Sequence, residues 1–308
     1  MASDPRTQAT DQGPRRIRVG DGPATRRVLV GGVLLVTALV LVAPLLAIFV
    51  EAFKHGMAAY AASFAAPDTQ YAIGLTLFTA LIVVPVNVGF GIAAAWCIAK
   101  FRFPGRNLLV ALVELPFSIS PIIAGVAYLF VYGAQGLLGP WLAEHDIKIM
   151  FAVPAIILAS LFVTAPFVAR ELIPLMIAQG SEEEEAAVTL GAGGWRILRL
   201  VTLPNVRFAL LYGAALCNAR VMGEFGAVSV VSGQIRGLTN TMTLHVEILY
   251  NEYQYSAAFA VASLLALLAL VTLVAKNVVE WRNARLQQTA DQPVEHPGQA
   301  AAIKPAVA

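Results

Sequence analysis

Charged side chains are scarce in this sequence. Of its 308 residues, only 13% are Asp, Glu, Lys or Arg, whereas 58% are hydrophobic, and the mean hydropathy is +0.72. A soluble domain of this length needs far more charged surface, and lipid is the solvent that tolerates so many apolar side chains. The composition therefore excludes an ordinary soluble globular protein.

Catalytic and nucleotide-binding signatures are also missing. No lysine follows a glycine, which excludes the Walker A sequence GK[ST] and P-loop binding of ATP. The motifs HExxH and GxSxG are absent, so an intramembrane enzyme is the less favoured class. The two cysteines, Cys97 and Cys217, fit no disulfide framework and no metal spacing, and we expect neither a metal site nor a cofactor in this chain.

Long apolar runs, by contrast, are abundant. A bilayer core requires about 20 apolar residues per helix, and six stretches meet that requirement. Because backbone groups cannot remain unpaired in lipid, all six are predicted to be helices of an all-α membrane protein. They are residues 28–50, 71–99, 108–132, 150–169, 208–231 and 256–279. We expect one membrane domain over residues 27–282, between disordered cytoplasmic tails at 1–26 and 283–308.

The positive charges predict the orientation of these helices. Seventeen Lys and Arg residues lie in the tails and in alternate loops on one side, three lie on the other side, and Arg220 lies within the fifth helix. Loops rich in Lys and Arg stay in the cytoplasm. The sequence therefore predicts a multi-pass membrane protein with both termini in the cytoplasm.

The loop at residues 170–207 is too long to be a simple connector. Ser181 is placed to cap a short acidic helix, with Glu184 at the capping-box position and Gly191 at its end. Pro204 is expected to close the segment before the chain re-enters the membrane. On these grounds alone, the acidic run is an ordinary solvated helix start.

The spacing in this loop resembles a known family. EAA at residues 185–187, Gly191 and Leu-Pro at 203–204 match the "EAA" loop of bacterial ABC-importer permeases, with Val201 in place of the usual Ile. The resemblance implies the type I permease fold, in which this loop forms a coupling helix that docks on the ATPase subunit. The residues that it assigns to coupling are Glu184, Glu185, Ala186, Ala187, Gly191, Leu203 and Pro204.

Three further segments resemble the W-type permease subunits of sulfate/thiosulfate importers in the binding-protein-dependent (MetI-like) family. They are VTAPFVARELIPLM at 163–176, GEFGAVSVVSG at 223–233 and TLHVEILYNEY at 243–253. This resemblance implies a T-type partner permease, two copies of an ABC ATPase that bind ATP and magnesium, and a periplasmic sulfate-binding protein, with no nucleic acid. Molybdate and related oxyanion permeases share parts of these segments, so another oxyanion is the alternative substrate.

Two sets of polar residues are candidates for the translocation pathway. In the fifth helix, Arg220 and Glu224 are i, i+4 neighbours, with Asn218 and Ser229 beside them. This pair either neutralises itself and holds the helix in the bundle, which we prefer, or Arg220 attracts an anion. In the third helix, Ser118 and Ser120 either donate to the anion or satisfy carbonyls freed by Pro116 and Pro121.

A secondary transporter is the alternative of a different class. Such chains usually carry internal repeats and about twice as many helices. The sequence shows no repeat, and the EAA-like loop has no role in that class.

Overall fold

The computed structural model describes residues 23–290, and every regular element in that part of the chain is helical. The chain divides between Ala47 and Ile48 into two compact units, whereas the sequence predicts one membrane domain over 27–282. Most of the two predicted tails lies outside the described residues. Residues 23–26 and 283–290, at their inner edges, are helical and belong to α1 and α15.

The first unit contains the N-terminal membrane helix. Elements α1 (Pro23–Thr37), η1 (Ala38–Val42) and α2 (Ala43–Phe53) join into one apolar helix that runs from Ala24 to Phe53, across the division between the units. This helix confirms the first predicted span.

The second unit contains the remaining helices. In chain order they are α3 (Gly56–Ala65), α4 (Pro67–Lys100), α5 (Arg106–Ser118), α6 (Pro121–Tyr132), α7 (Gly139–Glu144), α8 (Val153–Thr164), α9 (Pro166–Ala178), α10 (Glu182–Thr189), α11 (Gly194–Ile197), η2 (Leu198–Thr202), α12 (Leu203–Met222), α13 (Gly226–Val231), α14 (Met242–Asn251) and α15 (Tyr255–Ala290).

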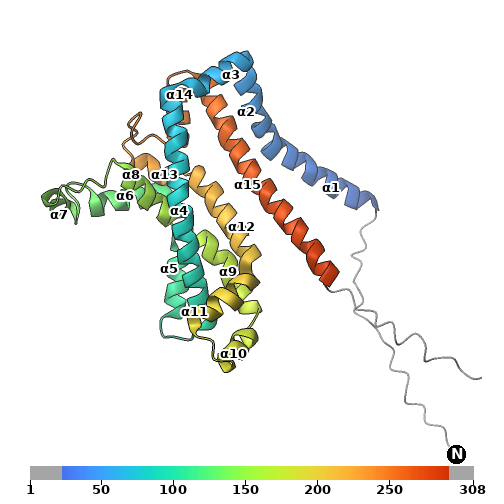
Figure 1. The fold of residues 1–308 in the computed structure, drawn as a ribbon. Coiled ribbons are helices and arrows are strands. Elements are labelled where there is room, and N and C mark those ends of the chain that lie inside the picture. Colours follow the sequence, from blue (N-terminus) through green and yellow to red (C-terminus); the bar gives the residue numbers. More distant parts are fainter. Residues whose placement is uncertain (1–22, 291–308) are drawn as a thin grey trace, which may run out of the picture. The chain divides into compact units, whose positions relative to one another are not determined.

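The centre of this unit is a bundle of α4, α9 and α12 (Figure 1). Val83, Leu172 and Cys217 are fully buried in the core that the three helices share. A small residue lets α4 and α9 approach closely, because a Cβ added at Gly91 would lie 2.6 Å from side-chain atoms of Val168. Beside this bundle, α13 packs against α6 and α8.

The membrane-spanning segments agree with the sequence prediction in number but not in every detail. Among the described residues, five helices are long and apolar enough to cross a membrane, and a sixth span exists if α5 and α6 are counted together. These two helices are bent by 108° at Ile119 and Ser120, so the segment predicted over 108–132 is two helices separated by a sharp break rather than one helix. Pro121 explains the break, since a proline disfavours helical backbone in the residue before it, and Ser120 is extended with ψ 133°.

The fifth span also differs from the prediction of 208–231. It begins at Gly194 and ends at Met222, and residues 223–225 separate it from α13. The predicted loop 170–207 is therefore mostly helix, because α9 continues to Ala178 and the next spanning helix starts at Gly194. The true connection is residues 179–193, which contains α10.

Pro204 lies inside this continuous helix, so the expectation that it closes the segment before membrane re-entry is wrong. Pro204 is preceded by the π-helical turn η2. In this turn the N–H of Leu203 donates to the carbonyl of Leu198. The same arrangement precedes Pro44, where the Ala43 N–H donates to Ala38 within η1. A widened turn makes room for a ring that would clash in an α-helix, and the helix continues through the proline.

Candidate functional site

Helix α10 is a short acidic segment at the end of the bundle where α4, α9 and the α11–α12 helix also have their ends (Figure 1). It starts after Ser181 and ends before Gly191, whose φ of +80° suits glycine. This confirms the predicted helix and its glycine terminus. The capping box is wrong: Ser181 makes no capping hydrogen bond, and its Oγ donates instead to Glu185 Oε1 at 2.5 Å.

Glu184 connects α10 to two membrane helices rather than to its own N-cap. Its Oε1 lies 2.8 Å from Lys100 Nζ at the end of α4, and it accepts a hydrogen bond from Thr202 Oγ1 at 3.1 Å. Partial burial acts to raise the pKa of Glu184, but the hydrogen bonds from Lys100, the backbone and Thr202 outweigh burial, and the pKa lies below its usual value. A charged partner at this distance explains why Glu184 turns away from the capping position.

Two further bonds strengthen these connections. Lys100 Nζ also donates to the carbonyl of Gly180, and Asn205 Nδ2 of α12 donates to Glu183. Helix α10 is thus tied to the end of α4 on one side and to η2 and α12 on the other.

The outward side of α10 is left open. Glu185 and Ala186 are exposed, Ala187 is half-buried, and the apolar side chains Val188 and Leu190 are 59% and 88% exposed. Apolar side chains gathered at a helix tip usually mark a contact surface. The structure thus brings five predicted coupling residues together on α10 and its end. The other two, Leu203 and Pro204, begin α12 between Thr202 and Asn205, the residues that bind Glu184 and Glu183, and are half-buried and exposed respectively.

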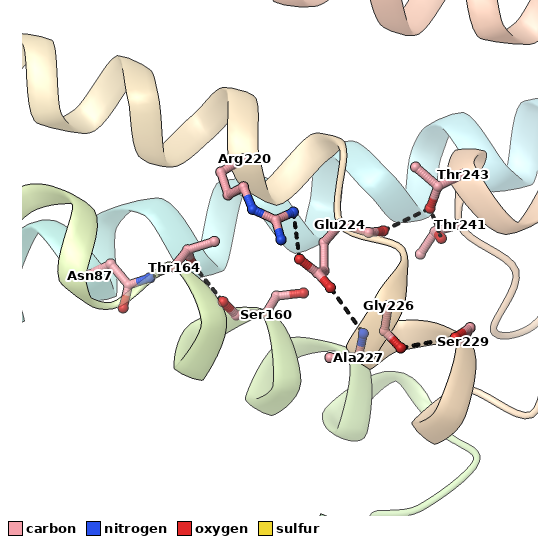
Figure 2. Close-up of polar contacts among 10 residues, drawn as sticks. All are labelled: Asn87, Ser160, Thr164, Arg220, Glu224, Gly226, Ala227, Ser229, Thr241 and Thr243. Atoms are coloured by element: carbon pink, nitrogen blue, oxygen red, sulfur yellow. Dashed lines mark hydrogen bonds and ion pairs between the residues drawn. The ribbon is translucent and has the colours of Figure 1, made fainter. Parts of the chain in front are cut away.

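The predicted ion pair is present at the far end of α12 (Figure 2). Arg220 Nη1 lies 2.6 Å from Glu224 Oε2 in a close ion pair without an aligned hydrogen bond. The two residues do not share a helix, because α12 ends at Met222 and Glu224 lies in the break before α13. Glu224 is 2% exposed, its Oε1 accepts the N–H of Ala227 at 3.0 Å, and its carbonyl accepts from Thr243 Oγ1 at 2.8 Å.

The remaining pathway candidates are dispersed. Asn218 donates only to Met222 Sδ at 3.8 Å, and Ser229 donates to the carbonyl of Gly226 within α13. Ser118 and Ser120 lie at the α5–α6 break and are exposed, and their hydroxyl groups have no hydrogen-bond partner among residues 23–290. The structure therefore gives no support to the idea that these serines satisfy carbonyls freed by the prolines.

Sequence reasoning missed two buried polar clusters. In the first, Asn87 Nδ2 of α4 donates to Thr164 Oγ1 at 2.7 Å, and Thr164 donates to the Ser160 carbonyl at 2.6 Å (Figure 2). In the second, His245 of α14 is 2% exposed, with Asn240 Nδ2 3.2 Å from its Nδ1 and Thr69 Oγ1 2.9 Å from its Nε2. Because the amide nitrogen of Asn240 can only donate, the ring proton lies on Nε2 and points to Thr69.

The side chains hydrogen-bonded to His245 are an amide, Asn240, and a hydroxyl, Thr69. Among the described residues, no group of three or more His, Cys, Asp or Glu side chains is arranged to hold a metal ion. No spacing signal in the sequence connects His245 to Thr69, since the contact joins distant parts of the chain.

Similarity to known proteins agrees with this geometry. A family model described as "Binding-protein-dependent transport system inner membrane component" matches residues 87–286. The sulfate transport system permease protein CysW of Escherichia coli strain K12 is 50% identical over 268 residues, which cover 87% of this chain and 92% of that protein. Its counterpart CysW in Synechocystis sp. is 52% identical over 79% of this chain and 88% of that protein. The sulfate transport system permease protein CysT of E. coli K12 is 36% identical over 85% of this chain and 97% of its own length.

A solved structure has the same fold. A chain of a bacterial ABC transporter for alginate import superimposes with a TM-score of 0.70 at 18% identity, over 83% of this chain and 96% of that one. The predicted all-α ABC-importer permease fold is confirmed. The chain belongs to the family of inner-membrane components of binding-protein-dependent transport systems.

Proposed function

We propose that this chain is the permease subunit of an ATP-driven sulfate importer and forms half of its translocation pathway. The observation that carries the proposal is α10: an exposed helix with an open apolar tip, tied to α4 and α12 through Glu184 and Glu183. The names of the CysW relatives, which cover most of this chain, supply the substrate. A permease of this kind performs no chemistry itself.

The partners follow from what this chain does not carry. It has no Walker A sequence, so ATP and magnesium bind to a separate ATPase, of which two copies serve the two permeases. The CysT relatives support a T-type permease as the second half of the pathway. A solved alginate transporter in complex with a substrate-bound periplasmic protein supports a soluble binding protein, here one for sulfate.

In this mechanism, ATP-driven closure of the ATPase pair displaces α10, and its ties to α4 and α12 convert that displacement into a change of the bundle. The residues in contact with the ATPase are Glu185, Ala186, Ala187 and the apolar tip at Val188 and Leu190. Gly191 supplies the turn. The proposal requires α10 and both termini in the cytoplasm, as the distribution of Lys and Arg predicts.

Arg220 has a structural role in this proposal. Its guanidinium neutralises Glu224, which in turn holds the start of α13 through the Ala227 N–H. Fixing the α12–α13 break in this way is the better supported of the two interpretations. Direct contact of Arg220 with the anion remains the alternative, since a third of its side chain is exposed.

The test is uptake of labelled sulfate by a strain in which the gene for this chain is deleted, with and without the gene restored. We expect restored uptake that depends on the ATPase and on the binding protein, and competition by thiosulfate but not by molybdate. Failure to restore sulfate uptake, or rescue of molybdate uptake instead, contradicts the sulfate assignment. Uptake that persists without the ATPase identifies a secondary transporter.

A further inference from the structure

A polar cavity of about 310 Å³ lies beside α10, between the α4–α5 turn and the α9–α10 junction. Among its lining residues are Lys100, Arg102, Arg106, Phe101, Ile177 and Gly180. No carboxylate is among the described residues that line it. The cavity is therefore a cationic pocket, of which the coupling mechanism uses Lys100 but neither Arg102 nor Arg106.

The three cations differ in how many of their hydrogen-bond donors already have partners. Lys100 contacts Glu184 and the carbonyl of Gly180, and Arg106 donates from Nε to the Ile98 carbonyl at 2.7 Å, which leaves its terminal nitrogens available. Arg102 is exposed and has no hydrogen bond or ion pair with any residue that the structure describes. The single carboxylate of Glu184 cannot balance this charge, so the pocket keeps a net positive charge.

The pocket lies where membrane helices end. The α4 span ends at Lys100, α5 begins at Arg106, and the α8–α9 span ends at Ala178. Three spanning segments that end together mark the level of the lipid headgroups, where cationic pockets between helices bind anionic lipids. Phe101 and Ile177, which line the pocket, are each 50% exposed, and Leu108, two residues after Arg106 on α5, is 63% exposed.

We propose that this pocket binds the phosphate group of an anionic phospholipid, with Arg102 and Arg106 on the phosphate oxygens. A soluble phosphate presents the same oxyanion, but the exposed Phe101, Ile177 and Leu108 provide a surface for acyl chains that a free ion does not need. The bound phosphate lies beside Lys100 and competes with Glu184 for its ammonium. Lipid binding therefore acts on the link between α4 and α10, whichever ion the chain transports.

The experiment measures retained lipid by native mass spectrometry of the full-length chain in its assembled complex. The complex is purified from nanodiscs of phosphatidylcholine alone or mixed with phosphatidylglycerol. We expect the unchanged chain to retain phosphatidylglycerol. Arg102→Ala should bind this lipid at least about tenfold more weakly, because a charge-assisted bond to the phosphate is removed. Arg102→Glu should lose the lipid, because the charge that faces the phosphate is reversed. The matched control is Arg196→Ala, which removes another exposed arginine, on α11 and outside the pocket.

Four outcomes overturn the proposal. The first two are equal lipid retention by Arg102→Ala and the unchanged chain, and an equal loss of lipid from Arg196→Ala. The third is Arg102-dependent binding of glycerol phosphate or inorganic phosphate with no phospholipid retained. The fourth is loss of the ATPase subunit from Arg102→Glu with the lipid content unchanged. The last result assigns the pocket to an acidic protein partner. None of these readouts involves sulfate, so a failure here leaves the proposed transport function standing.

Discussion

The two ends of the second unit use polar side chains in opposite ways. Around α10, three of the four glutamates are exposed, and the fourth, Glu184, is partly buried and pairs sideways with Lys100 and Thr202 of neighbouring helices. Around α13 and α14, Glu224 and His245 are almost fully buried, and each has two or more polar partners. Pairs at the surface contribute at most about 1 kcal/mol, whereas breaking a buried pair costs several times more. The α10 end can therefore be displaced by a partner, while the α13–α14 end is fixed.

The largest expected effect on folding is at Glu224. Glu224→Ala leaves Arg220 without its counter-charge and the Ala227 N–H without an acceptor, which should lower the free energy of unfolding by about 3 kcal/mol. Thermal unfolding of the assembled complex measures the loss. Glu224→Gln keeps an acceptor for the N–H and should lose less.

Asn218→Ala is the control on α12, the helix that carries Arg220. The hydrogen bond that the structure describes for Asn218 goes to a methionine sulfur, and we expect almost no change. A melting temperature of Glu224→Ala equal to that of Asn218→Ala would show that the buried pair does not hold the α12–α13 break.

A smaller effect, dependent on pH, is expected at His245. Burial lowers the pKa of His245; Asp68 and Glu252 act to raise it and Arg236 to lower it further, and the pKa stays below the usual value. Between the two pKa values the unfolded chain binds more protons than the folded chain. The contribution of neutral His245 is therefore complete above about pH 6.5 and is lost as the pH falls through the folded-state pKa.

Melting temperatures of the complex between neutral and mildly acidic pH test this expectation. The unchanged chain should lose stability on acidification, and His245→Gln, which cannot take up a proton, should show a flatter profile. Parallel profiles for the two proteins would exclude His245 as the acid-sensitive group.

The sequence predicts the elements that depend on local patterns. The spans follow from the length of apolar runs, and α10 follows from its acidic first turn and Gly191. Hydropathy does not show where a run is interrupted, although in 108–132 Pro121 marks the position of the break. Nor does it show that a π-helical turn carries the helix through Pro204, since that depends on hydrogen bonds that shift by one residue.

The polar contacts were the least predictable part of the candidate site. Glu184 has a good capping position by spacing, yet it binds Lys100, which lies far away in the sequence. Spacing identifies Arg220 and Glu224 as partners but not the end of the helix between them, and it gives no sign that Thr69 and Asn240 enclose His245. Contacts between distant segments depend on how the helices pack, and a single sequence does not contain that information.

The smallest effects on folding, and the largest on transport, are expected at α10. Glu185→Lys reverses an exposed charge. In Gly191→Pro the proline cannot adopt the φ of +80°, so this substitution changes only the local turn. The decisive measurement compares ATP hydrolysis with labelled-sulfate uptake for these variants in the reconstituted complex, with Glu182→Lys as a control for charge reversal on the same helix. We predict an unchanged melting temperature, continued hydrolysis and uptake reduced at least about tenfold for both variants, with near-normal uptake for Glu182→Lys. Normal uptake by both Glu185→Lys and Gly191→Pro would contradict the role of α10 in coupling.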